Sequence, residues 1–182
     1  VVRQISRYTD PDAVNYDSTA ECDDGSCNVA TGCTDPTACN YDMNADMTTA
    51  TDFTNNGLTT LDRNQTLTTG GGLKGSGDIT VVDTHNLTLN QTGDSAYSGS
   101  VSGAGQFTKD GQGSLTLNGA ADAIDLDEGL TVSNGELVLG SENVLDVSQN
   151  VEVTGGELKI SESQRFNDLT VESDAKTSAT AD

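Results

Sequence analysis

The sequence is poor in aromatic and basic residues. Aromatic side chains make up 4% of its 182 residues, Trp is absent, and 8 Lys and Arg stand against 29 Asp and Glu, for a formal net charge of −21. A chain this acidic repels phosphate backbones, so we expect no nucleic-acid partner. No apolar run approaches the ~20 residues that a membrane helix needs, so we expect no membrane insertion.

Proline, cysteine and glycine are unevenly placed. Both prolines and all four cysteines lie within the first 40 residues, whereas 18 of the 20 glycines follow residue 56. Such a shift in composition marks a change of architecture. We therefore predict a module over residues 1–50, a second domain over 57–175 and a polar tail over 176–182.

The first module contains an internal repeat. The pattern T-D-P-x-A-x-N-Y-D-x-x-A begins at Thr9 and again at Thr34. Neither helical nor strand periodicity accompanies it, so we expect a loop-rich module of Asx turns and short extended pieces.

Acidic side chains crowd this module. Residues 10–46 hold eight Asp and one Glu without any Lys or Arg. Hard cations such as Ca²⁺ take six to eight oxygen ligands from Asp- and Asn-rich loops, although Asp and Asn also serve turns by capping their own backbone. We expect calcium binding through equivalent residues of both copies: Asp10, Asn15 and Asp17, and Asp35, Asn40 and Asp42.

The four cysteines are expected to form disulfides in an oxidising location, because a small polar module buries too little core to fold without cross-links. They are Cys22, Cys27, Cys33 and Cys39. A zinc site is disfavoured, since no C-x₂-C pair and no local histidine is present. Three disulfide pairings remain open.

This half resembles a short repeat, approximately G-C-T-D-x-x-A-x-N-Y-D-x-x-A-x-x-D-D-G-S-C, of marine microbial surface proteins and marine phage proteins. The resemblance covers about residues 8–47. In relatives with two cysteines per repeat, the two retained cysteines correspond to Cys27 and Cys33. The resemblance therefore implies that Cys27 pairs with Cys33 and that Cys22 pairs with Cys39.

The second half alternates apolar and polar residues with a period of two. Triplets such as Leu87-Thr88-Leu89 place two aliphatic side chains on one face and a polar one on the other, which predicts half-buried strands. The inward side chains should be Leu87, Leu89, Leu115, Leu117, Leu130, Val132, Leu137, Leu139, Val151, Val153, Leu158 and Ile160.

These strands recur at the length of a solenoid coil. Segments that begin at Gly75 and Leu87 match segments 28 residues later, at Gly103 and Leu115; the segment at Leu130 matches the one at Val151, 21 residues on. Offsets of this size predict an all-β fold, a parallel β-helix (β-solenoid) of about four to six coils, over a β-sandwich with its shorter hairpin spacing. On the 28-residue match, Asn90 and Asn118 would stack as an amide ladder.

Residues 99–160 resemble the autotransporter-associated β-strand repeat, approximately G-x-G-x-L-T-K-x-G-x-G-T-L-T-L-x-G followed by T-V-x-x-G-x-L-x-L-G. The matching segments begin at Gly103 and Thr131. The resemblance implies a right-handed parallel β-helix in a secreted or surface-displayed protein.

Catalytic chemistry has few candidate residues. His85, the single histidine, lies between two predicted strands and is expected to be a solvated loop residue. Asp122, Asp125, Asp127 and Glu128 form the dense acidic cluster of the β region, in a loop where solvation is the simpler explanation. Tyr97 and Phe107 are the aromatic candidates for stacking on sugars, with Phe107 at a core-type position. We therefore expect no enzyme.

The sequence favours a non-enzymatic structural or adhesive protein of the extracellular space, a cell surface or a virion. In this hypothesis a β-solenoid stalk or fibre subunit displays the calcium-stabilised module. Its partners would be copies of itself or other surface or virion structural proteins, with cell-surface polysaccharide as a further candidate. The alternatives are a carbohydrate-active β-helix enzyme, such as a polysaccharide lyase or depolymerase, and a calcium-dependent carbohydrate-binding module.

Overall fold

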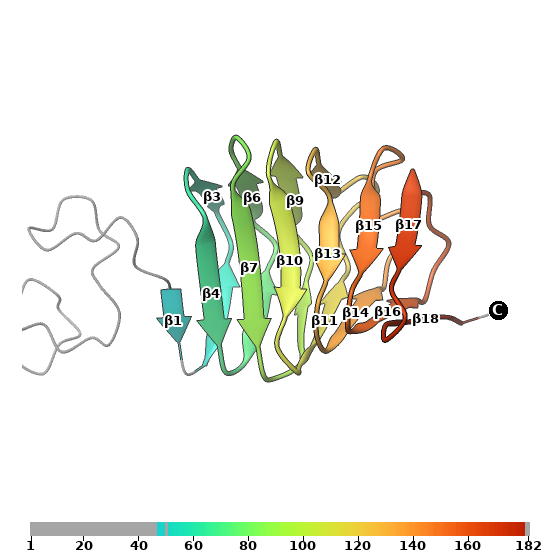
Figure 1. Ribbon diagram of the computed structural model, residues 1–182. Coiled ribbons are helices and arrows are strands. Elements are labelled where there is room, and N and C mark those ends of the chain that lie inside the picture. Colours follow the sequence, from blue (N-terminus) through green and yellow to red (C-terminus); the bar gives the residue numbers. More distant parts are fainter. Residues whose placement is uncertain (1–46, 50, 181–182) are drawn as a thin grey trace, which may run out of the picture. The chain divides into compact units, whose positions relative to one another are not determined.

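The computed structural model describes residues 47–49 and 51–180, which form parallel strands wound into a β-solenoid (Figure 1). The fold class predicted for this half is confirmed: every strand pairing given by register is parallel, and about six turns stack on one another. The repeat module lies outside the described residues.

Three sheets make up the sides of the solenoid. Sheet A has the order β1-β4-β7-β10-β13-β15-β17. Its strands are β1 (Met47–Thr49), β4 (Gln65–Thr69), β7 (Asn86–Gln91), β10 (Gln106–Asp110), β13 (Leu130–Val132), β15 (Asn150–Val153) and β17 (Asp168–Val171).

Sheet B follows sheet A around each coil. Its strands are β2 (Asp52–Asn55), β5 (Gly72–Gly75), β8 (Ser95–Tyr97), β11 (Ser114–Leu117), β14 (Glu136–Leu139), β16 (Glu157–Ile160) and β18 (Lys176–Ala179). The strands thus extend beyond the expected 57–175 at both ends, and part of the expected polar tail pairs with β16.

Sheet C closes the first coils. It contains β3 (Leu58–Leu61), β6 (Asp78–Val81), β9 (Ser100–Gly103) and β12 (Ile124–Leu126). In the next coil Leu145 continues the stack through an isolated bridge to Ile124, and both side chains are fully buried. The third side therefore keeps its apolar packing where regular strands give way to loops.

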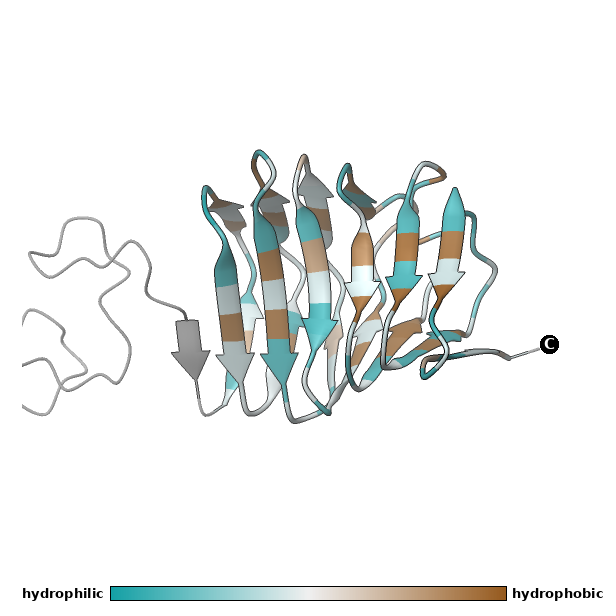
Figure 2. Cartoon of the chain, in the orientation of Figure 1, coloured by the Kyte–Doolittle hydropathy of each residue, from teal (hydrophilic) through white to brown (hydrophobic). Residues whose placement is uncertain are grey.

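The core follows the alternation of each strand (Figure 2). Eleven of the twelve side chains predicted to point inward are buried, and Ile160, near the C-terminal end of the stack, is half-buried. Phe107 also lies in the core with no exposed surface, as expected. Most inward side chains rest on apolar counterparts in the next coil, as Leu130 does on Val151 and Leu137 on Leu158, so apolar burial runs along the axis.

The register confirms one predicted repeat and corrects the other. Leu130 pairs with Val151 and Leu137 with Leu158, both 21 residues apart. The 28-residue offset is wrong as a coil length, because Leu87 pairs with Phe107 on sheet A whereas Leu115 pairs with Ser95 on sheet B. All faces share the same polar–apolar alternation, so strands of different faces resemble one another in sequence.

The predicted amide ladder is wrong for the same reason. Asn90 pairs with Asp110 and with Thr68 on sheet A. Asn118 follows β11 of sheet B, where its backbone N–H donates to Tyr97 O at 2.8 Å. The two amides therefore belong to different columns.

Candidate functional site

The solvent-facing surface of sheet A differs in chemistry from that of sheet B. On sheet B, Lys74 Nζ lies 2.7 Å from Asp52 Oδ2 and Lys159 Nζ lies 2.5 Å from Glu136 Oε2. On sheet A the outward positions of β4 to β17 hold only hydroxyl, amide and carboxyl side chains. They are Thr66, Thr68, Asn86, Thr88, Asn90, Gln106, Thr108, Asp110, Thr131, Asn150, Glu152, Asp168 and Thr170.

Threonines form a row across this surface. Thr66 pairs with Thr88, Thr88 with Thr108, and Thr108 with Thr131. The row then passes to Glu152, so it is interrupted by a carboxylate. Neighbouring strands in a sheet lie ~4.8 Å apart, which sets the spacing of the row. Amides bond across it: Asn86 Nδ2 donates to Thr108 Oγ1 at 3.2 Å.

A hollow of about 130 Å³ opens on sheet A over β10, β13, β15 and β17. Its polar lining comes from four successive coils and combines amide, hydroxyl and carboxyl groups: Gln106, Glu128, Thr131, Asn150, Glu152, Asp168 and Thr170. Thr131, a residue of this lining, has 9% of its surface exposed. Gln106 Nε2 donates to its Oγ1 at 3.2 Å. The hollow is therefore a concave polar site that sheet A offers to a ligand.

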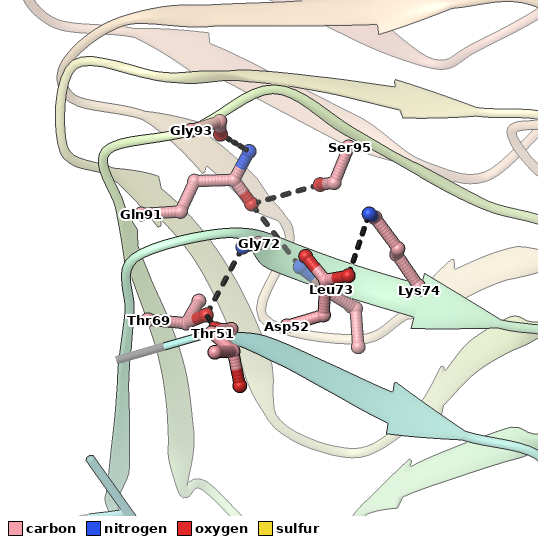
Figure 3. A network of polar contacts seen from close by, with 9 residues as sticks. All are labelled: Thr51, Asp52, Thr69, Gly72, Leu73, Lys74, Gln91, Gly93 and Ser95. Atoms are coloured by element: carbon pink, nitrogen blue, oxygen red, sulfur yellow. Dashed lines mark hydrogen bonds and ion pairs between the residues drawn. The ribbon is translucent and has the colours of Figure 1, made fainter. Parts of the chain in front are cut away.

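A buried polar seam lies inside the corner between sheets A and B (Figure 3). Gln91 has no exposed surface. Its Nε2 donates to Gly93 O at 3.0 Å and to Ser114 O at 2.8 Å. Its Oε1 accepts a hydrogen bond from Ser95 Oγ at 3.2 Å. One coil below, Thr69 Oγ1 accepts from Gly72 N at 3.0 Å. These side chains satisfy corner groups that strand pairing leaves free.

Lys109 carries a charge into the solenoid interior. Alternation on β10 turns its side chain inward between Leu89 and Val132, and it has no exposed surface. Its Nζ donates to the backbone oxygens of Asp110 at 2.7 Å, Gly111 at 3.0 Å and Asn134 at 3.3 Å. Burial lowers the pKa of Lys109 to about 8, partly opposed by the negative charge of Asp110.

The structure divides the predicted acidic cluster. Burial and the carboxylates of Asp146 and Asp127 raise the pKa of Asp125, and Asp122 acts in the same direction. Glu128 instead lines the hollow on sheet A. No group of three or more His, Cys, Asp or Glu in the described ranges is arranged to hold a metal ion.

The aromatic candidates for sugar stacking are both inside the protein. Tyr97 and Phe107 have no exposed surface. Tyr97 Oη donates to Gly77 O at 2.5 Å and accepts from Asn55 Nδ2 at 2.9 Å, which makes it a core tether. His85 is half-buried between β6 and β7, and its backbone oxygen accepts from Gln106 N at 2.8 Å.

Other predicted site residues lie outside the described residues. They are the calcium candidates Asp10, Asn15, Asp17, Asp35, Asn40 and Asp42, and the disulfide candidates Cys22, Cys27, Cys33 and Cys39. Within residues 47–49 and 51–180, no helix has the length and apolar character needed to cross a membrane.

Sequence reasoning missed the hollow. Gln106, Thr131 and Glu152 stand 25 and 21 residues apart, and each looks like an ordinary outward residue of its own strand. The 21-residue repeat places Thr131 beside Glu152, which was the available signal.

The fold defines the protein as a parallel β-solenoid. In comparisons with known proteins, no family model, no curated protein and no solved structure matches the chain. The resemblances stated for residues 8–47 and 99–160 stay predictions.

Proposed function

We propose that this protein is a non-enzymatic structural or adhesive component of a cell surface, the extracellular space or a virion. The solenoid would serve as a stalk or fibre subunit, and the N-terminal repeat module would be displayed on it and stabilised by calcium. The observation that carries the proposal is the solenoid itself, whose packed core supports long solvent-facing sheets. Extended surfaces of this kind are what repeat proteins use for contact.

The polar chemistry of sheet A supports an adhesive role. Its outward side chains present donors and acceptors over six strands, from β4 to β17. Copies of the same chain or other surface proteins are the expected structural partners, and surface polysaccharide is the expected adhesive one.

The location can be tested directly. Antibodies raised against the solenoid, applied with gold labelling to intact cells and purified virions of the source, should mark filaments, envelope or virion surface. Label confined to the cell interior would contradict the proposal.

A carbohydrate-active enzyme is the second candidate, because the hollow on sheet A contains paired carboxylates. Glu128 and Glu152 both line it, and paired carboxylates are the groups that hydrolyse glycosidic bonds. Release of new reducing ends from a polysaccharide panel, lost in a Glu128→Gln variant, would favour the enzyme over the structural role.

A further inference from the structure

The hollow on sheet A contains a buried hydroxyl that is only half satisfied. Thr131 is nine-tenths buried, although its side chain lies on the outward row between Thr108 and Glu152. Its Oγ1 accepts a hydrogen bond from Gln106 Nε2. Within the described part of the chain its own proton has no acceptor. A buried donor without a partner destabilises the folded state, so the hollow favours a ligand that brings an acceptor to Thr131.

The rest of the lining offers mainly acceptors. Glu128, Glu152 and Asp168 bring carboxylates to the hollow, and all three side chains are exposed. Ionised carboxylates only accept hydrogen bonds. The amides of Gln106 and Asn150 add both donors and acceptors. A suitable ligand therefore accepts from Thr131 and donates to several carboxylates at once.

This pattern discriminates between classes of ligand. An anionic polymer would be repelled by the three carboxylates, because no Lys or Arg lines the hollow. An ammonium group or a metal ion brings no acceptor for the Thr131 proton. A hydroxyl group both accepts and donates, and a sugar ring carries several such groups in fixed positions.

The neighbouring surface allows the ligand to be a polymer. From the hollow, Thr108, Thr88 and Thr66 continue the same row toward β7 and β4, whose outward side chains are uncharged. The row follows the stacked strands, so an extended glycan lying along it would meet one hydroxyl about every 4.8 Å. Burial of Thr131 and the intervening Glu152 break the row, which disfavours a flat crystalline partner such as ice.

We propose that the hollow over β10, β13, β15 and β17 binds one sugar unit of an uncharged polysaccharide, with Thr131 donating to a ring or hydroxyl oxygen and Glu152 accepting from a hydroxyl. The inference deepens the adhesive role and rests on it. Gln106 positions the Thr131 hydroxyl through its hydrogen bond.

Affinity gel electrophoresis of the full chain tests this proposal. The protein migrates through native gels that contain dextran, galactomannan, xyloglucan or a soluble β-1,3-glucan, with alginate as the anionic comparison. We expect retardation by at least one neutral polymer and none by alginate. Thr131→Val keeps the shape of the side chain and should weaken that binding roughly three- to tenfold, the effect of one hydrogen bond. Glu152→Ala should weaken it by about tenfold, because it removes a charged acceptor.

Matched controls separate binding from folding. Thr116→Val changes an outward threonine of sheet B whose row already holds Val138, and Glu162→Ala removes an exposed carboxylate of a loop. Both should bind as the wild type does, and no variant should melt below the wild type. Loss of binding in the controls, retention only by alginate, or no retardation by any neutral polymer would overturn the proposal. If no neutral polymer retards the protein but gold labels the surface, the sugar site is refuted and the structural role is still supported.

Discussion

Lys109 is the residue at which the interior of the solenoid departs most from an apolar core. Its ammonium is held by three backbone oxygens from two coils, and among the described residues it forms no ion pair with a carboxylate. The oxygens belong to Asp110 at the end of β10, to Gly111 in the corner after it, and to Asn134 in the corner after β13. The side chain therefore joins adjacent corners, at the cost of placing a charge where water is excluded.

This arrangement predicts a stability that depends on pH. The pKa of Lys109 falls from 10.5 to about 8 on folding. Between these values the unfolded chain holds the proton and the folded chain releases it, so the free energy of unfolding rises with pH. The cost of the buried charge is fully present below about pH 8. We expect urea denaturation at pH 9.5 to give a more stable protein than at pH 7.5, by on the order of 1–2 kcal/mol.

A Lys109→Met variant is the control for that titration. It keeps the length of the side chain and removes the ionisable group, so the rise in stability between the two pH values should be lost. An equal rise in wild type and variant would show that another group causes it.

Leu117 tests the inward assignment of the aliphatic residues. It is 1% exposed and stacks between Tyr97 and Leu139. Leu117→Asp would bury an unpaired carboxylate in the core and should lower the free energy of unfolding by several kcal/mol. Thr116→Asp, one residue earlier on the solvent side, should have a small effect. Similar melting temperatures for the two variants would contradict the assignment.

At the scale of elements, polar tethers hold strands of different coils together. Tyr97 at the end of β8 contacts Asn55 at the end of β2, although β5 lies between these strands. The position between them in register is Gly75, which has no side chain to obstruct the tyrosine ring. Burial raises the pKa of Tyr97 above its usual value, in keeping with a neutral hydroxyl inside the stack.

Removal of this hydroxyl should loosen the first coils. Tyr97→Phe keeps the ring in the core and deletes the bonds to Gly77 O and Asn55 Nδ2. Asn55 Nδ2 retains its bond to Asp78 O at 3.2 Å, so we expect a loss of about 1–3 kcal/mol rather than unfolding. Hydrogen exchange should show the loss in β2 and β3 before β14 and β16. Uniform exchange across all coils would argue against a local tether.

Strand pairing shows how far an element can be predicted from its own residues. The alternation of Leu130-Thr131-Val132 indicates a strand, and the match to Val151 indicates its neighbour. The neighbour of Leu87 could not be predicted in this way, because Phe107 and Leu115 are both buried apolar residues followed by a threonine, as Leu87 is. The corner lengths between them decide the register, and corners carry no periodic signal.

At the scale of the whole molecule, we expect calcium to raise thermal stability. The ligands predicted in the repeat module belong to a segment with eight Asp, one Glu and no basic residue between positions 10 and 46. Like charges this close in sequence repel one another, and a bound cation would neutralise them. Calorimetric titration of the metal-stripped chain should show heat of binding, together with a higher melting temperature in millimolar Ca²⁺.

The control for calcium is the same chain with Asp17→Asn and Asp42→Asn, which removes one charge from each predicted set. Its melting temperature should respond less to calcium. Identical melting of the wild type in chelator and in calcium would leave these residues a role in turns alone.

The sequence by itself determined the β architecture, the parallel stacking and nearly all of the core. Alternation arises from the pleat of a single strand, so Leu115 and Leu117 reveal their inward direction without knowledge of their neighbours. Alternation even places Lys109 inward. Only the tertiary structure revealed that the Asn134 oxygen accepts a hydrogen bond from the Lys109 ammonium. The same holds for the hollow that Gln106, Thr131 and Glu152 line. These groups meet because coils of unequal length stack in one register, and that register depends on corner geometry and long-range packing rather than on any local pattern.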